Sequence, residues 1–271
     1  MAGSTVGEPA GGYLLYEWGT PPGQPDVRLY QHGSRYRLWI HGGGSYGIDP
    51  EAGRIVVPAD EDGRRREQLL WSLPSAVYLL HRGDLPVHSA AVEIDGTGVL
   101  LGAPGGHGKT TLAAACYQAG YRVLSEDLTC VRLSPDPVII PGPAMLRLRR
   151  DVLESLGLSD SSSVSWHGNR VSLALDRQRG DCRPVPLGAM VFLRRDADGV
   201  RSERVRAVDA ARDLWELSFY LPSEDGMARC FAQVVDLARI VPVWNLYRPM
   251  RVDILPAVVA LIEALAAGHD R

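Results

Sequence analysis

The chain has 271 residues, enough for one α/β unit with one added layer. Its 45% hydrophobic and 23% charged residues are close to the averages of globular domains, which excludes wholesale disorder and a fibrous structure. The formal net charge of -3 gives no bulk electrostatic attraction to nucleic acid or to an anionic membrane, so we expect neither partner.

Residues 1–62 predict a small β-rich lobe. Three short segments, rich in aromatic and β-branched residues, are separated by glycine and proline turns, which is typical of antiparallel strands. A hairpin follows at 47–57. No residue of this lobe suggests catalytic chemistry, so we expect it to pack on a core formed by residues 63–271. The predicted strands cover 13–18, 27–30 and 36–40.

The core begins with a helical segment at 66–81, where apolar residues recur with the period of a helix. Pro74 either kinks this helix or marks its true start. Two strands follow at 87–94 and 99–102, joined by the Gly-rich turn 95–98. A second glycine-rich segment follows the second strand directly, so we expect this segment to form a loop at the end of a hairpin's second strand.

Beyond this segment we expect helices and strands without a repeat or a long linker. Good helix formers fill 111–120 and end in a glycine, which suits a helix C-terminus. Strand 121–125 ends in two acids, Glu126 and Asp127, and a Ser-rich loop covers 159–165. The other predicted elements are strands at 128–133, 185–193 and 241–247 and helices at 145–156, 207–220, 227–239 and 254–267.

Residues 105–111 have the composition of a phosphate-binding (Walker A) loop. Such a loop needs consecutive backbone N–H groups that face the ligand, which is why glycines cluster in it. Lys109 follows to meet the β- and γ-phosphates and Thr110 to hold Mg²⁺, while Ala103 stands where the motif usually has its first glycine. His107 has no separate role. The predicted nucleotide-binding residues are Gly105, Gly106, His107, Gly108, Lys109, Thr110 and Thr111.

Glu126 and Asp127 place carboxylates at a strand end beside the phosphates. Phosphoryl transfer needs a metal and a group that accepts or orients the proton of the nucleophile. If the two acids alternate across the strand end, one can face Mg²⁺ near Thr110 while the other faces an incoming hydroxyl. The alternative is a solvated turn after a strand.

The stretch 88–131 resembles the catalytic core of HPr kinase/phosphorylase and its related kinases, whose fold is similar to that of phosphoenolpyruvate carboxykinase. It shares the His-bearing strand, the hairpin, the loop, the short helix and the strand that ends in two acids. The resemblance implies an α/β fold with a P-loop kinase core, to which the lobe is added. It also implies that Glu126 is the base and that Asp127 works with the metal. The matching positions are His88, Lys109, Thr110, Glu126 and Asp127.

The chain departs from the regulatory enzyme of that family in two respects. Glu126 stands where the family has aspartate, and we find no second signature of the kind that accompanies the phosphorylase reaction. Later segments of the chain show a weaker similarity to related kinases whose genes lie beside peptide natural-product genes. Some of those kinases phosphorylate a serine of a lasso-peptide precursor. The resemblance therefore implies an ATP- and Mg²⁺-dependent kinase that acts on a hydroxyl, above all that of a serine, of a peptide or small protein. The weaker matches cover 141–143, 167–170, 186–189 and 241–246.

Arg147, Arg149 and Arg170 are cations that could reach the transferred phosphate or an acidic substrate, although each alone is also an ordinary surface arginine. Two other functions stay open. One is a nucleotide-binding accessory or regulatory protein without phosphotransfer, and the other is a small-molecule hydroxyl kinase.

No run approaches the roughly 20 apolar residues that span a bilayer, and the first residues lack the pattern of a secretory leader. The four cysteines lack the close paired spacing of a zinc or redox site and predict buried apolar positions. We therefore expect a cytoplasmic protein. Its expected cofactors are ATP and Mg²⁺, and a homo-oligomer is possible. The cysteines are Cys116, Cys130, Cys182 and Cys230.

Overall fold

The computed structural model describes residues 12–19, 26–59, 63–159, 164–167, 170–175 and 181–268. The protein is a mixed α/β structure that contains antiparallel sheets and one mixed sheet. It divides into two compact units. The first unit comprises Met1–Asp84 and Tyr220–Ala228, and the second comprises Leu85–Phe219 and Arg229–Arg271.

The first unit is built on an antiparallel sheet with the strand order β1-β2-β3-β4-β5. One face of the sheet carries the core of the unit, which includes Leu29, Leu38, Tyr46 and Ile48. The predicted strands and the β4–β5 hairpin are confirmed. The elements are β1 (Tyr13–Trp18), β2 (Val27–His32), β3 (Arg35–Ile40), β4 (Gly44–Asp49), β5 (Arg54–Val56), α1 (Gly63–Leu70) and α2 (Leu73–His81).

The helix expected at 66–81 is two helices, because α1 ends at Leu70 and α2 begins at Leu73. Pro74 lies in the first turn of α2, where its missing N–H and fixed φ cost nothing, so it marks a helix start. Val77 is buried in the core of the sheet, and apolar residues of both helices pack against that core. The first unit therefore continues to Asp84 instead of ending at residue 62 as expected.

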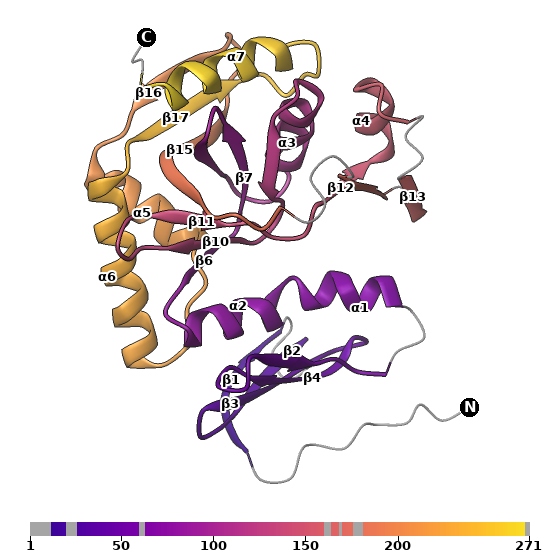
Figure 1. Ribbon diagram of the computed structural model, residues 1–271, viewed down its shortest axis with the longest axis vertical. Helices are drawn as coiled ribbons and strands as arrows, with labels where there is room; N and C mark the ends of the chain where they lie inside the picture. Colours follow the sequence, from indigo (N-terminus) through magenta and orange to yellow (C-terminus); the bar gives the residue numbers. More distant parts are fainter. Residues whose placement is uncertain are drawn as a thin grey trace. The chain divides into compact units, whose positions relative to one another are not determined.

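The second unit contains the mixed sheet, with the strand order β6-β10-β11-β15-β8-β7-β9 and with β17 and β16 continuing from β15 (Figure 1). Three of its strands, β6, β11 and β16, were not expected from the sequence, and neither were the last two residues of β15. The strands are β6 (Leu85–Val87), β7 (Ser89–Ile94), β8 (Thr97–Gly102), β9 (Arg122–Ser125), β10 (Thr129–Arg132), β11 (Val138–Ile140), β15 (Val185–Arg195), β16 (Arg201–Arg204) and β17 (Val243–Arg248).

The strand directions bring several chain segments to one edge of this sheet. Strand β15 is parallel to both β8 and β17. Strand β7 is antiparallel to β8 and to β9, so β9 runs in the same direction as β8. The carboxyl ends of β8, β9, β15 and β17 and the start of β7 therefore share an edge, which is where open α/β sheets bind ligands.

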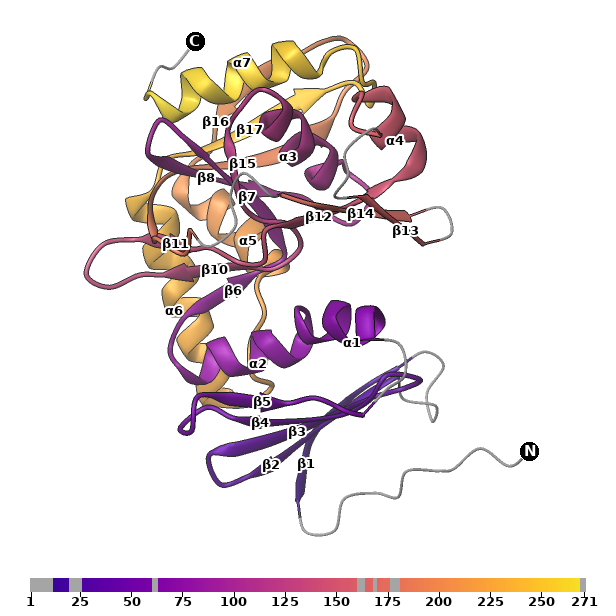
Figure 2. The same cartoon turned by 45° about the vertical axis from the view of Figure 1, so that its right-hand side comes forward.

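Helices cover both faces of the mixed sheet (Figures 1 and 2). Alternate residues of β15 belong to different cores: Val191 packs with α3 and α7, and Phe192 packs with α5 and α6. This explains the continuous apolar run of β15. No helix within the described ranges is long and apolar enough to cross a membrane. The helices are α3 (Lys109–Gln118), α5 (Ala207–Leu217), α6 (Glu224–Ile240) and α7 (Leu255–Ala266).

A separate three-stranded sheet follows the acids, in the order β12-β14-β13. The helix predicted at 145–156 is wrong for its first half, because β12 covers Met145–Arg149 and only Arg150–Ser155 forms α4. Leu146 and Leu148 are buried between less buried neighbours, which is the period of a strand. The sheet is completed by β13 (Val164–His167) and β14 (Arg170–Ala174).

Two further expectations are modified by the structure. Of the predicted Ser-rich loop, residues 160–163 lie outside the described residues, and the loop ends early because β13 begins at Val164. Three of the four cysteines are buried as expected, but Cys182 is exposed.

Candidate functional site

The loop between β8 and α3 has the backbone that its glycines predict. Gly106 and Gly108 have φ values of 76° and 79°, a region that residues with a Cβ rarely adopt. A Cβ on Gly108 would lie 2.5 Å from Nη2 of Arg248. Ala103, which stands at the usual first glycine position, does not have a positive φ, and its side chain is buried in the core. The backbone at this position therefore does not need a glycine.

Lys109 is the first residue of α3 and only 6% exposed. Its Nζ donates to the carbonyl oxygens of Ala103, at 2.7 Å, and Pro104, at 3.4 Å, and lies 3.0 Å from Nε2 of His88. Burial lowers the pKa of this ammonium, and the nearby acids Asp127 and Glu126 oppose that shift. The charge of Lys109 is thus held at the start of the loop.

His88 links the lysine to the acids. Its Nδ1 lies 3.1 Å from the carbonyl oxygen of Asp127 and 3.7 Å from that residue's Oδ1. We assign the ring proton to Nδ1, which donates to this carbonyl and leaves Nε2 free to accept from Lys109. Burial, with the Lys109 charge as a second cause, lowers the pKa of His88 and favours this neutral form.

The two acids occupy different surroundings. Glu126 is largely buried; its Oε1 accepts from the Thr110 hydroxyl at 3.3 Å and its Oε2 from Nε of Arg147 at 2.9 Å. Burial raises the pKa of Glu126, and the Arg147 charge acts against that rise. Asp127 is 52% exposed and lies 3.5 Å from Nη2 of Arg147. Arg147 therefore bridges both carboxylates.

Two arginines that were not predicted from the sequence hold the loop. Arg195 donates to the carbonyl oxygen of Gly106 at 3.0 Å, and Arg248 donates to those of His107, at 3.0 Å, and Gly108, at 3.4 Å. Because a trans peptide unit is planar, a His107 carbonyl held by Arg248 turns the N–H of Gly108 to the opposite side. The sequence signal that could have revealed these arginines is their position. Each is the last residue of a strand that runs parallel to β8.

Arg248 is also the most enclosed cation of the site, with 2% exposure. Its Nε is buried and has no hydrogen-bond partner among the described residues. A buried N–H without an acceptor is unfavourable unless a ligand or water supplies one. Arg248 thus combines a contact to the loop with a buried donor that has no acceptor among the described residues.

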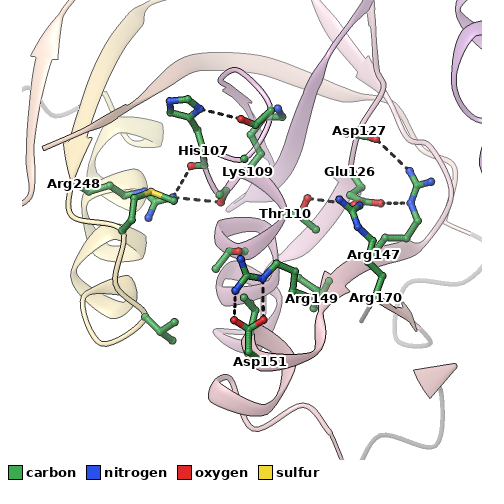
Figure 3. A pocket seen from close by; sticks show the side chains of 18 of the residues that line it. His107, Lys109, Thr110, Glu126, Asp127, Arg147, Arg149, Asp151, Arg170 and Arg248 are labelled. Atoms are coloured by element: carbon green, nitrogen blue, oxygen red, sulfur yellow. Dashed lines mark hydrogen bonds and ion pairs between the residues drawn. The ribbon is translucent and has the colours of Figure 1, made fainter. Parts of the chain in front are cut away.

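All the predicted site residues line one cavity of about 420 Å³ (Figure 3). It includes Arg147, Arg149 and Arg170 as well as Thr111 and His107, whose Nδ1 is 3.2 Å from the carbonyl oxygen of Gly105. Arg149 is paired with Asp151. Six cationic side chains against three carboxylates make the lining suitable for a polyanion. The charged residues are Lys109, Arg147, Arg149, Arg170, Arg248, Arg251, Glu126, Asp127 and Asp151.

The oxygens at Thr110 suit Mg²⁺. One ion at about 2.1 Å from each of two neighbouring ligands requires oxygens roughly 3 Å apart, and the Thr110 hydroxyl and Glu126 Oε1 are separated by 3.3 Å. Within the described ranges, no cluster of three or more His, Cys, Asp or Glu side chains could hold a metal. Mg²⁺ commonly keeps water ligands and binds through one or two protein groups together with substrate phosphates.

No family model matches the chain, and no curated protein matches it. Among solved structures, the chain is similar to the Hpr(Ser) kinase/phosphatase from Coxiella burnetii, with a TM-score of 0.36 and 12% sequence identity. The alignment covers 68% of this chain and 97% of that chain.

Proposed function

We propose that the chain is an ATP- and Mg²⁺-dependent kinase that transfers the γ-phosphate to a hydroxyl, serine above all, of a peptide or small protein such as a lasso-peptide precursor. The observation that carries the proposal is the convergence of two groups in one cavity. The first is a glycine-rich loop with a buried lysine, Lys109. The second is an acid pair, Glu126 and Asp127, of which Glu126 accepts a hydrogen bond from the hydroxyl of Thr110, the residue after that lysine.

The loop and its cations account for binding of the triphosphate. The N-terminus of α3 and the Gly108 N–H present positive dipoles, and Lys109 adds a charge for the β- and γ-phosphates. Arg248 holds the loop in this arrangement through the carbonyl oxygens of His107 and Gly108. Phosphoryl transfer depends mainly on such positioning and electrostatic stabilisation, because the transition state is loose.

The acids divide the remaining tasks. Glu126 would hold the metal with Thr110, because its carboxylate contacts that hydroxyl. Mg²⁺, when bound, neutralises charge on the β- and γ-phosphates. Asp127 is the more exposed acid and contacts His88, so it would orient the acceptor hydroxyl and take its proton. These roles are the reverse of those implied by the sequence resemblance.

Arg147 completes the proposed site. It neutralises part of the acid pair, and its cation would stabilise the charge of the transferred phosphoryl group. Arg170 is exposed and lines the same cavity, as a further cation for phosphate or acceptor.

The test is acceptor-dependent release of ADP from ATP and Mg²⁺, with the products identified by mass spectrometry. We expect serine-containing peptides to stimulate release and to gain a phosphate, and Lys109→Ala to abolish both. Stimulation by hydroxylated metabolites alone would favour the small-molecule kinase. Tight nucleotide binding without release under any acceptor would favour the accessory protein.

A further inference from the structure

The cavity extends beyond the space that a triphosphate needs. At about 420 Å³ it lies within the range of sites for drug-sized ligands. Besides the loop and the acids, two chain segments line it, one from the end of β12 to the start of α4 and one between β17 and α7. Apolar side chains occur on both sides. They are Leu148 and Val152 on the first segment and Met250 and Val252 on the second.

These apolar side chains differ from the rest of the lining. Met250 is 47% exposed and lines the cavity, so its side chain is accessible to a ligand there. It lies next to the loop, because a Cβ on Gly108 would be 3.5 Å from its Cε. A flexible, polarisable thioether beside an apolar wall suits the face of an aromatic ring.

The direction of a bound nucleotide follows from the positions of the acids. In Figure 3, Glu126 and Asp127 lie on one side of Thr110, whereas Arg248 lies on the other. The γ-phosphate has to approach the acids, where the acceptor is activated. The α-phosphate and everything attached to it must then lead away from them, along the side of Arg248 and Met250.

We propose that Val152 and Met250, with Val252, form a subsite for the nucleobase, so that the phosphate donor is a nucleoside triphosphate and not an inorganic polyphosphate. The inference rests on the proposed function for the phosphate end of the ligand. The base is held by apolar contact with its two faces, and the loop with Lys109 and Arg248 holds the phosphates.

Binding measured by calorimetry separates the two halves of the ligand. The probes are a non-hydrolysable ATP analogue and inorganic tripolyphosphate, each with Mg²⁺. We expect the wild-type chain to bind the analogue more tightly. Met250→Ala should weaken analogue binding between about twofold and tenfold, because a sulfur–aromatic contact is lost, and should leave tripolyphosphate binding within about twofold. Val152→Ala should act in the same direction.

Two further variants control this experiment. Lys109→Met should weaken binding of both probes, because it acts on the phosphates. Val208→Ala removes an exposed side chain of α5 that does not line the cavity, so it should affect neither probe. Thermal unfolding of each variant shows whether it is folded.

The outcomes are distinguishable. Equal affinity of the wild type for both probes, or equal weakening of both by Met250→Ala, would overturn the base subsite. Base-dependent binding of the analogue without phosphate transfer to any acceptor would support the nucleobase subsite and contradict the proposed kinase activity. If neither probe binds, both proposals fall.

Discussion

At the scale of single residues, the site depends on contacts among four charged side chains and one histidine. Lys109, His88 and Asp127 form a chain of contacts, and Arg147 joins Asp127 to Glu126. Burial shifts the pKa of three of these groups away from the charged form, raising it for Glu126 and lowering it for Lys109 and His88. The neighbouring acids favour the charged form of Lys109, and Arg147 favours that of Glu126, so removing one of these neighbours should change the pKa of the group beside it.

The carboxyl group of Glu126 offers the clearest case. In the metal-free protein, its pKa should lie above the ordinary glutamate value, and Arg147→Met should raise that pKa further, because the opposing cation is lost. Carboxyl-carbon NMR of the labelled protein measures both values. A pKa unchanged by Arg147→Met would contradict the ion pair.

The same shift has a consequence for stability. Because the pKa of Glu126 is raised on folding, the folded state binds the proton more tightly than the unfolded state does. The stability contributed by this group is therefore fully present below the unfolded pKa and is lost as the pH rises through the folded pKa.

At the scale of elements, the loop is held by its neighbours as much as by its own sequence. Gly108→Ala introduces a side chain at a positive φ, 2.5 Å from Nη2 of Arg248. A residue with a Cβ in that region costs about 1–2 kcal/mol, so we expect a lower melting temperature together with weaker binding of Mg²⁺ and the ATP analogue.

Gly105→Ala is the matched control for this substitution. A Cβ there meets nothing within 4 Å, and the φ of Gly105 is not positive, so the melting temperature should stay that of the wild type. If the two alanine variants melted at the same temperature, the conformational role of Gly108 would be excluded.

Arg248 gives a second element-scale prediction. Arg248→Met keeps much of the side-chain volume but removes the donors to the carbonyl oxygens of His107 and Gly108. Hydrogen bonds to charged groups contribute roughly 1.5–3 kcal/mol, so we expect analogue binding to weaken about tenfold or more. Arg251→Met removes an exposed cation of the same cavity and should weaken binding less. Equal effects would show that only net charge matters.

The elements also show what the sequence can reveal. The loop, the helix after it and the two acids were predicted correctly as neighbours, because glycine spacing and strand ends are local signals. The strand β12 was mistaken for part of a helix, since Met145–Arg149 alternates over only five residues and runs straight into α4. Arg195 and Arg248 were missed because their role depends on parallel pairing between strands far apart in the chain.

At the scale of the whole molecule, every residue that lines the cavity belongs to the second unit. The first unit has its own sheet and core. The boundary between them lies after α2, and the sequence could not place it, because the apolar period of a helix does not reveal which sheet the helix covers. The proposed chemistry can therefore be tested in the full chain with substitutions confined to the second unit.

Transfer of labelled γ-phosphate from ATP to a serine peptide, followed in single-turnover reactions of the full chain, tests the central claim most directly. We predict that Asp127→Asn retains binding of Mg²⁺ and nucleotide but loses transfer by about a hundredfold or more, since a positioned base contributes 10²–10⁴-fold. Glu126→Gln should lose metal-dependent nucleotide binding as well. Transfer at the wild-type rate by both variants would contradict the account.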